Sequence, residues 1–110
     1  MNVKPVNVIH ILGGSGSGTT TLAKEISERY GYIHLDTDDY FWKKTDPPYT
    51  DIRDVIERQN MLKKSIDAAE KCVISGSLTG WGDMLIPRFD LVIYLFVPTD
   101  IRIKRLKENI

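Results

Sequence analysis

Apolar positions recur along the chain with the two periodicities that distinguish strands from helices. Residues 6–12 are almost continuously apolar and run directly into a glycine-rich segment, which predicts a buried strand that ends in a turn. Over residues 19–30 apolar side chains recur every three or four positions, and Gly31 follows, which predicts a helix with a glycine C-cap. Residues 32–35 predict a second strand. The first three elements therefore read strand, helix, strand, and a parallel sheet is expected.

The pattern continues with further alternating elements. They are a loop over residues 40–50, a helix over residues 51–69 with Thr50 or Asp51 as its N-cap, a strand over residues 72–75, a glycine-containing loop over residues 76–87, a strand over residues 91–97 and a helix that begins at Thr99. The near-continuous apolar character of residues 91–97 predicts burial on both faces.

Composition limits the classes of protein that fit. The chain has 110 residues, enough for one domain over residues 1–110 but not for a second module. Fifteen basic and fifteen acidic side chains give no net charge and no electrostatic footprint for nucleic acid or an anionic membrane, so neither is expected as a partner. No apolar run approaches the ~20 residues that a membrane helix needs. The lone Cys72 is expected to be a small buried hydrophobe, which fits a cytoplasmic protein.

The segment after the first strand carries a phosphate-loop pattern. A P-loop has glycine, four residues, glycine, lysine, and serine or threonine between a strand and a helix, and here Gly13, Gly18 and Thr20 fall at matching positions. Glycines let successive backbone N–H groups turn toward a phosphate, and the helix N-terminus adds a favourable dipole. We expect Mg2+ on the Thr20 hydroxyl. The predicted ATP-binding residues are Gly13, Gly14, Ser15, Gly16, Ser17, Gly18, Thr19, Thr20 and Thr21.

One position departs from that pattern, because Thr19 stands where the lysine belongs and a cation on the β and γ phosphates is lost. Two other interpretations stay open. The glycines form only a strand-to-helix corner without a ligand, or they belong to a dinucleotide-binding fold. In the second case Gly14 and Gly16 begin the fingerprint and Asp36 is the ribose-binding acid, although Thr19 occupies the third glycine position.

An acidic cluster follows the second predicted strand. Asp36 and Asp38 stand at its carboxyl end, at the sheet edge where the glycine loop lies and where ligands of open α/β sheets bind. There Asp36 would hold Mg2+ through water, and Asp38 would orient the acceptor or take its proton. The alternative is that the cluster forms only a turn and a helix N-cap.

Aromatic and basic residues stand near the predicted site. Those in predicted loops either stack on a base or sugar or close the edge of the core; they are Tyr40, Phe41, Trp42 and Trp81. Arg53 and Arg58 either bind phosphate or are solvated or salt-bridged. His10 and His34 stand in predicted strands and are expected to be hydrogen-bonded core histidines.

Three segments, GGSGSGTTTLAKEI, HLDTDDYFW and FDLVIYLFVPTDIRIKRLK, resemble the small P-loop kinases, the superfamily of adenylate, uridine, shikimate and gluconate kinases. The acids Asp36 and Asp38 resemble the acceptor-site acids of shikimate and gluconate kinases, and the run from Asp38 to Phe41 resembles the acid-plus-aromatic segment of uridine kinases. The chain is most similar to an adenylate-kinase-related bacterial group with GSGTTT and with DPPYT followed by arginine. Thr19 is then a group trait.

This resemblance implies a three-layer α/β/α fold with a parallel sheet of order 2-3-1-4. In these kinases an arginine-bearing lid, a fifth strand and closing helices follow, whereas this sequence stops at Ile110. The domain is therefore expected to be C-terminally incomplete relative to the family. Either the chain is a truncated product, or another copy in a homo-oligomer covers the open sheet edge.

The prediction is an ATP-dependent kinase that moves the γ-phosphoryl group to a small-molecule acceptor, a nucleoside or nucleotide. Asp38 and Asp36 are the predicted catalytic acids, and Thr20 and Asp36 the predicted Mg2+ ligands. The predicted acceptor-binding residues are Asp38, Tyr40, Trp42, Arg53 and Trp81. The competing hypothesis is a nucleotide-binding or phosphate-binding regulatory module without turnover.

Overall fold

A four-stranded sheet, parallel throughout, forms the centre of the computed structural model, which describes residues 5–13, 18–48, 50–78 and 80–96. The strand order is β2-β3-β1-β4, which confirms the predicted order 2-3-1-4. The strands are β1 (Val8–Gly13), β2 (Ile33–Asp36), β3 (Cys72–Ser75) and β4 (Leu91–Leu95).

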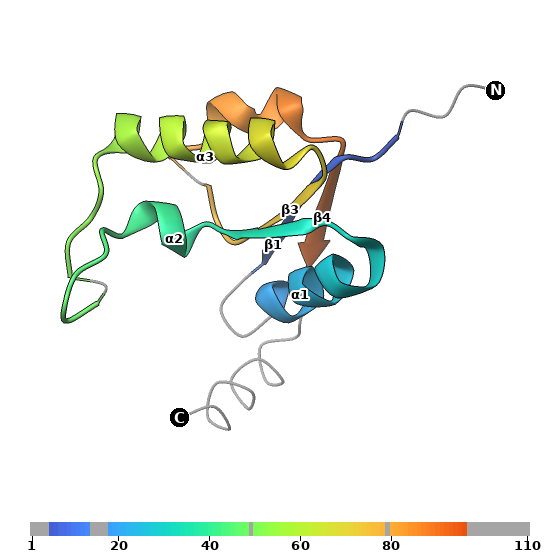
Figure 1. Cartoon of the computed structure of the whole chain (residues 1–110), viewed down its shortest axis with the longest axis horizontal. Helices are drawn as coiled ribbons and strands as arrows, with labels where there is room; N and C mark the ends of the chain where they lie inside the picture. The colour runs from blue at the N-terminus through green and yellow to red at the C-terminus, as the bar shows by residue number, and fades with distance from the viewer. Residues whose placement is uncertain (1–4, 14–17, 49, 79, 97–110) are drawn as a thin grey trace.

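Helices cover both faces of this sheet (Figure 1). They are α1 (Thr19–Tyr30), α2 (Asp38–Phe41), α3 (Val55–Ala69) and the 3-10 helix η1 (Asp83–Arg88). In Figure 1, α1 lies below the sheet, and α3 and η1 lie above it, so the three-layer α/β/α architecture is confirmed. None of the helices in the described part of the chain is long and apolar enough to cross a membrane. The helix predicted from Thr99 lies outside the described residues.

The core is divided by the sheet into two clusters. Val8 faces the cluster under α3, whereas Ile9 and Ile11 face the cluster under α1, because side chains alternate along a strand. The α3 cluster contains Val8, Tyr40, Leu62, Ile66, Cys72, Ile74, Leu78, Trp81 and Leu85. The α1 cluster contains Ile9, Ile11, Ala23 and Val73. Burial on both faces is what the nearly continuous apolar run of β1 predicted.

The prediction that the fourth strand is buried on both faces is wrong. β4 pairs with β1 along one side, and among the described residues no strand lies along its other side. Ile93 and Leu95 pack toward α1, but Val92 and Tyr94 are 52% and 64% exposed. An apolar run of this length does not distinguish a central strand from an edge strand.

Local side-chain chemistry moves several predicted boundaries. The helix predicted over residues 51–69 begins at Val55, with Asp54 rather than Thr50 or Asp51 as its N-cap, because the Asp54 carboxylate accepts hydrogen bonds from the N–H groups of Ile56 and Glu57. Residues 51–53 instead pair in antiparallel fashion with residues 41–43. The predicted loops over residues 40–50 and 76–87 contain part of α2 and most of η1.

Candidate functional site

The carboxyl end of β1 leads toward the N-terminus of α1. Gly18 caps this helix with φ 91°, a left-handed conformation that favours glycine. The first turn of α1 consists of Thr19, Thr20 and Thr21 and contains no acidic side chain. The first N–H groups of a helix have no partner within it, so this end suits an anion. The predicted phosphate-binding residues Gly14, Ser15, Gly16 and Ser17 lie outside the described residues.

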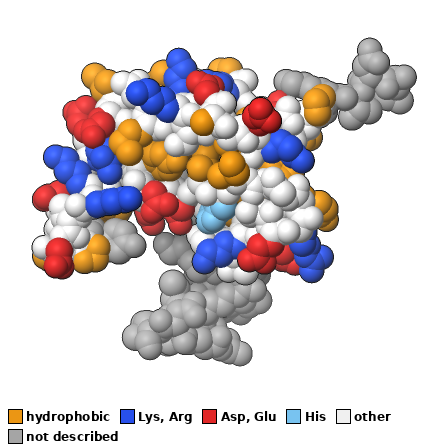
Figure 2. Space-filling model, viewed as in Figure 1, with side chains coloured by type: hydrophobic (Ala, Val, Ile, Leu, Met, Phe, Trp, Pro, Cys, Tyr) orange, Lys and Arg blue, Asp and Glu red, His pale blue; other side chains and the backbone are white. Residues whose placement is uncertain are grey.

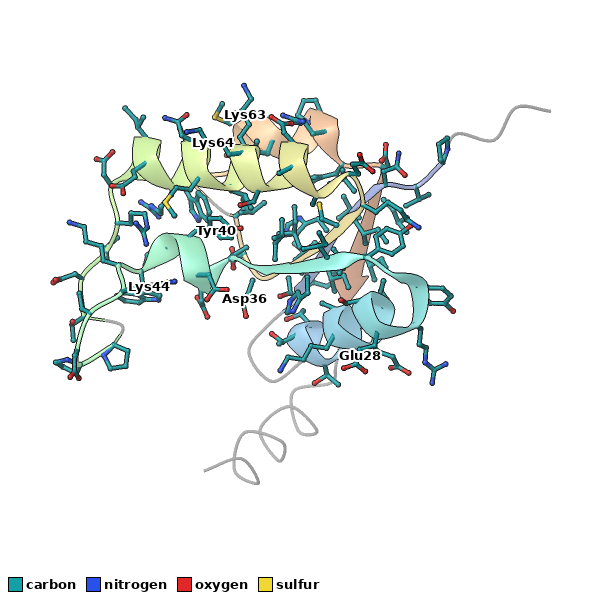
Figure 3. The ribbon with its side chains drawn as sticks, in the orientation of Figure 1. Glu28, Asp36, Tyr40, Lys44, Lys63 and Lys64 are labelled. Carbon is teal, nitrogen blue, oxygen red and sulfur yellow. The ribbon has the colours of Figure 1, made fainter. Side chains whose placement is uncertain are left out.

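Asp36 ends β2 at the same edge of the sheet. It is in register with Ser75, which is in register with Ile11 of β1, so β3 lies between Asp36 and β1. Two strand spacings put the ends of β2 and β1 about 10 Å apart. One Asp36 oxygen accepts a hydrogen bond from the Asp38 N–H at 3.0 Å, so Asp36 also forms the turn that the alternative interpretation predicted. Figure 3 shows Asp36 where β2 runs into α2.

Asp38 opens α2 and has a perturbed acidity. Partial burial raises the pKa of its carboxyl group, and the neighbouring charges of Asp36 and Asp39 raise that pKa further. A carboxylate whose negative charge is disfavoured is a better proton acceptor than an ordinary surface aspartate. The raised pKa makes Asp38 a candidate general base.

A cavity of about 270 Å³, the inner cavity, opens beside Asp38. Its walls come from the end of β2, α2 and the segment after β3, and are formed by Thr37, Asp38, Phe41, Trp42, Ser77 and Trp81. The structure thus brings together Asp38, Trp42 and Trp81, which the sequence predicted as acceptor-binding residues. Thr37 and Ser77 were not predicted, because neither belongs to a motif of its own.

Arg58 of α3 lies against two walls of the inner cavity. Its guanidinium carbon is 4.6 Å from the centroid of the Phe41 ring and 5.2 Å from that of Trp81. The residue is only 6% exposed. In the described part of the chain its Nε is buried with no hydrogen-bond partner, and no carboxylate lies within ion-pair distance of it. The sequence left Arg58 undecided between phosphate binding and a surface role, and the structure excludes the surface role.

A second and wider cavity, the outer cavity, adjoins the first. It has a volume of about 510 Å³ and shares Asp38 and Trp42 with the inner cavity. Its other walls include Asp39, Lys43 and Lys44. Figure 2 shows acidic side chains gathered over α2 with basic side chains beside them. Asp38 and Trp42 therefore line both a small aromatic cavity and a wider, charged one.

Two predicted acceptor-binding residues have other roles in the structure. Tyr40 is 8% exposed and belongs to the core, and its hydroxyl is hydrogen-bonded to Ser65 of α3. Figure 3 shows Tyr40 on the α3 side of α2. The Arg53 guanidinium binds the carbonyls of Tyr40 and Trp42 and the Glu57 carboxylate. Both residues are thus engaged with the protein itself.

His10 and Cys72 follow the sequence predictions, whereas His34 is hydrogen-bonded but only partly buried and is not a core residue. His10 is 6% exposed, its Nε2–H donates to the Gly76 carbonyl at 2.7 Å, and burial lowers its pKa. His34 Nε2 lies 2.7 Å from the Ser75 hydroxyl. Cys72 is fully buried, and burial raises the pKa of its thiol to about 11. These groups have structural roles.

Thr20 and Asp36 are the residues here that suit Mg2+. A hydroxyl and a carboxylate are hard oxygen ligands of the kind this ion prefers. The described residues contain no cluster of three or more acidic, histidine or cysteine side chains that would hold a metal by themselves. This donor set fits an ion that keeps several waters and takes its remaining ligands from phosphates, as Mg2+ does.

The sequence matches a known protein family and several characterised and uncharacterised proteins. Residues 9–110 match the model of a protein family described as AAA domain. An uncharacterized protein of Bacillus subtilis, YqaC, is 46% identical over 101 residues, which cover 92% of this chain and 55% of that protein. A cytidylate kinase of Pyrococcus furiosus is 32% identical over 110 residues, which cover 90% of this chain and 55% of the kinase. The chain therefore spans about half the length of these curated relatives.

A solved structure shares the fold. Shikimate kinase from Acinetobacter baumannii, in complex with shikimate, matches with a TM-score of 0.63 over 94% of this chain and 64% of that chain. The two sequences are 17% identical, so the likeness concerns the architecture. It agrees with the parallel sheet and the helices on both of its faces.

Proposed function

Because the chain belongs to the AAA domain family and is a small P-loop kinase-like protein, we propose that it is an ATP-dependent kinase whose acceptor is a nucleoside monophosphate. The observation that carries this proposal is the inner cavity. It combines a carboxyl group of raised pKa, aromatic walls and, behind two of those walls, an arginine whose buried Nε has no partner among the described residues. Cytidylate kinases among the relatives support a nucleotide acceptor.

Each part of a nucleotide has a matching group. A planar base packs on an aromatic face such as that of Trp42. The positive charge of Arg58, behind the Phe41 and Trp81 walls, favours an anionic phosphate in the inner cavity. Asp38 accepts a hydrogen bond from an amino or hydroxyl group of the acceptor and, when the attacking group is a hydroxyl, takes its proton.

In the proposed reaction an acceptor oxygen forms a bond to the γ-phosphorus of ATP. The bond between this phosphorus and the oxygen that joins it to the β-phosphorus breaks, and ADP leaves. The N-terminus of α1 holds the phosphates of ATP through backbone N–H groups. Thr20 and Asp36 would hold Mg2+, which neutralises phosphate charge when bound. With Thr19 at the lysine position, backbone groups and the metal supply more of the charge stabilisation than in a lysine-bearing loop. The proposed place of action is the cytoplasm, where ATP is supplied.

ADP formation by the full chain at neutral pH tests this proposal. The acceptors are CMP, UMP, AMP, cytidine and shikimate, and we expect turnover with a monophosphate. Asp38→Asn is expected to lower kcat/KM with the monophosphate by about 10–100-fold, because it removes a hydrogen bond between a charged carboxylate and the acceptor. Asp51→Asn, which alters an exposed carboxylate of the neighbouring loop, is the matched control and is expected to leave kcat/KM unchanged.

The outcomes separate the alternatives. Turnover that is unaffected by Asp38→Asn contradicts the role of Asp38. A rise in melting temperature with ATP and Mg2+ but no ADP formation with any acceptor supports the regulatory nucleotide-binding module. A rise in melting temperature with NAD but not with ATP supports the dinucleotide-binding interpretation.

A further inference from the structure

Arg53 lies at the point where the segment after α2 returns to the body of the protein. That segment leaves at residue 42, and its two ends pair through the bridge between Trp42 and Ile52. The Arg53 N–H donates to the Phe41 carbonyl at 2.8 Å. The Arg53 side chain is 13% exposed, which is low for an arginine beside a loop.

The guanidinium group of Arg53 binds backbone rather than solvent. Its Nε donates to the Tyr40 carbonyl, one terminal nitrogen donates to the Trp42 carbonyl, and the other to Glu57, each at 3.2 Å. The last carbonyls of a helix have no partner within it, and the Tyr40 carbonyl is one of these. The planar guanidinium group has several donors in fixed directions and can bind two such carbonyls at once. The ammonium group of a lysine is a single point charge and cannot reproduce these two directed hydrogen bonds.

The two carbonyls belong to residues on either side of Phe41. Phe41 contacts the Arg58 guanidinium at 4.6 Å, and Trp42 contacts Phe41 edge to face with ring centroids 5.0 Å apart. Phe41 lines the inner cavity, and Trp42 lines both cavities. A shift of this backbone therefore moves two aromatic walls and the ring that packs on Arg58.

We propose that Arg53 is the positioning residue of the acceptor site, a role that rests on the proposed function. It holds the backbone from Tyr40 to Trp42 so that the aromatic walls of the inner cavity stay in place, and it does not itself touch the acceptor. Loss of the guanidinium hydrogen bonds to the Tyr40 and Trp42 carbonyls weakens acceptor binding and leaves the ATP-binding end of the sheet unchanged. The Glu57 ion pair is an exposed addition to this arrangement.

Fluorescence tests the positioning independently of turnover. The chain has two tryptophans, so Trp81→Phe leaves Trp42 as the only one. In this background Arg53→Lys is expected to raise the acrylamide quenching constant of Trp42 at least twofold, while Glu57→Gln leaves it unchanged. Arg53→Gln is the second variant, and far-UV circular dichroism identifies any variant that has not folded.

Kinetics of the chain with both tryptophans test the consequence for the site. Arg53→Lys is expected to raise the KM for the acceptor at least tenfold, with the KM for ATP changed less than twofold. A purely structural role would lower the melting temperature and reduce kcat without this split between the two substrates. An unchanged quenching constant or an unchanged acceptor KM overturns the proposal. If the wild-type chain has no turnover, the kinase proposal fails, and the quenching constant still decides whether Arg53 positions Trp42.

Discussion

Arg58 allows a quantitative test, because its burial and its ring contacts have opposite effects on the free energy of unfolding of the free protein. Within the described part of the chain its Nε is buried without a hydrogen-bond partner, and leaving a buried donor unpaired costs about 1–3 kcal/mol. The contacts with Phe41 and Trp81 each contribute about 0.5–2 kcal/mol in the other direction. The terms nearly cancel, so Arg58→Met, which keeps an unbranched apolar side chain, is expected to change the free energy of unfolding by less than about 1 kcal/mol.

Binding of the acceptor changes this balance, because the phosphate of CMP is attracted by the positive charge of Arg58 behind the cavity walls. CMP at ten times its Kd stabilises a protein that binds it only when folded by about 1.4 kcal/mol. For a domain of this size that free energy corresponds to a rise in melting temperature of roughly 6–11 °C. Arg58→Met is expected to lose most of this rise, although its stability without CMP is nearly that of the wild type.

The measurements are urea unfolding followed by far-UV circular dichroism, and calorimetry with and without CMP. Tryptophan fluorescence is unsuitable here because Arg58 contacts Trp81. Arg29→Met is the matched control. Arg29 forms an exposed ion pair with Glu25, and such a pair contributes less than about 1 kcal/mol to the free energy of unfolding. If Arg58→Met lowers the free energy of unfolding by more than about 3 kcal/mol, the buried charge of Arg58 is fully compensated in the free protein, and the expected near-cancellation is refuted. An undiminished CMP effect refutes the binding role.

Three further outcomes are expected. Thermal unfolding is expected to show that Gly76→Ala destabilises the protein by about 1–3 kcal/mol more than Gly80→Ala. Both glycines have a positive φ, so the backbone strain is similar in the two variants. A Cβ at Gly76, however, would lie 2.1 Å from Thr37 Oγ1, whereas a Cβ at Gly80 would have nothing within 4 Å. Cys72, whose thiol pKa is raised to about 11, reacts with a thiol reagent much faster in urea than in native buffer; equal rates contradict its burial. The raised pKa of Asp38 means that the folded state binds its proton more tightly than the unfolded state, so the stability due to this group is lost as pH rises through the raised pKa. Asp38→Asn therefore gains stability relative to wild type at neutral pH but not at acidic pH, as urea unfolding at both pH values would measure.

Much of the fold could be predicted because each strand is an apolar run bounded by turn residues. The boundaries depended on single side chains that hydropathy does not reveal. The apolar pattern placed the N-cap at Thr50 or Asp51, whereas the pairing of residues 51–53 with residues 41–43 moves it to Asp54. The exposure of β4 depends on which strands lie beside it, and this is a property of the whole sheet.

The site was predictable where the topology alone places a residue. Asp36 and Asp38 follow a strand, so their position at the carboxyl edge follows from the parallel sheet. α2 has only four residues, too few for a hydrophobic period to show which side chain points inward. Tyr40 consequently was assigned to the site although it belongs to the core, whereas the decisive burial of Arg58 depends on contacts between α2, α3 and the segment before η1.

Among the described residues nothing pairs with the outer edge of β4, and this has a practical consequence for handling the chain in solution. From Leu91 to Leu95 the strand has no charged side chain and no proline, the devices by which proteins protect a free edge. An unprotected edge is a template for an added strand, and antiparallel pairing with a second copy related by a two-fold axis is the self-association to test for. Val92→Lys places a charge on this surface, and the dependence of sedimentation on concentration, compared between this variant and the wild type, measures how much self-association the edge causes.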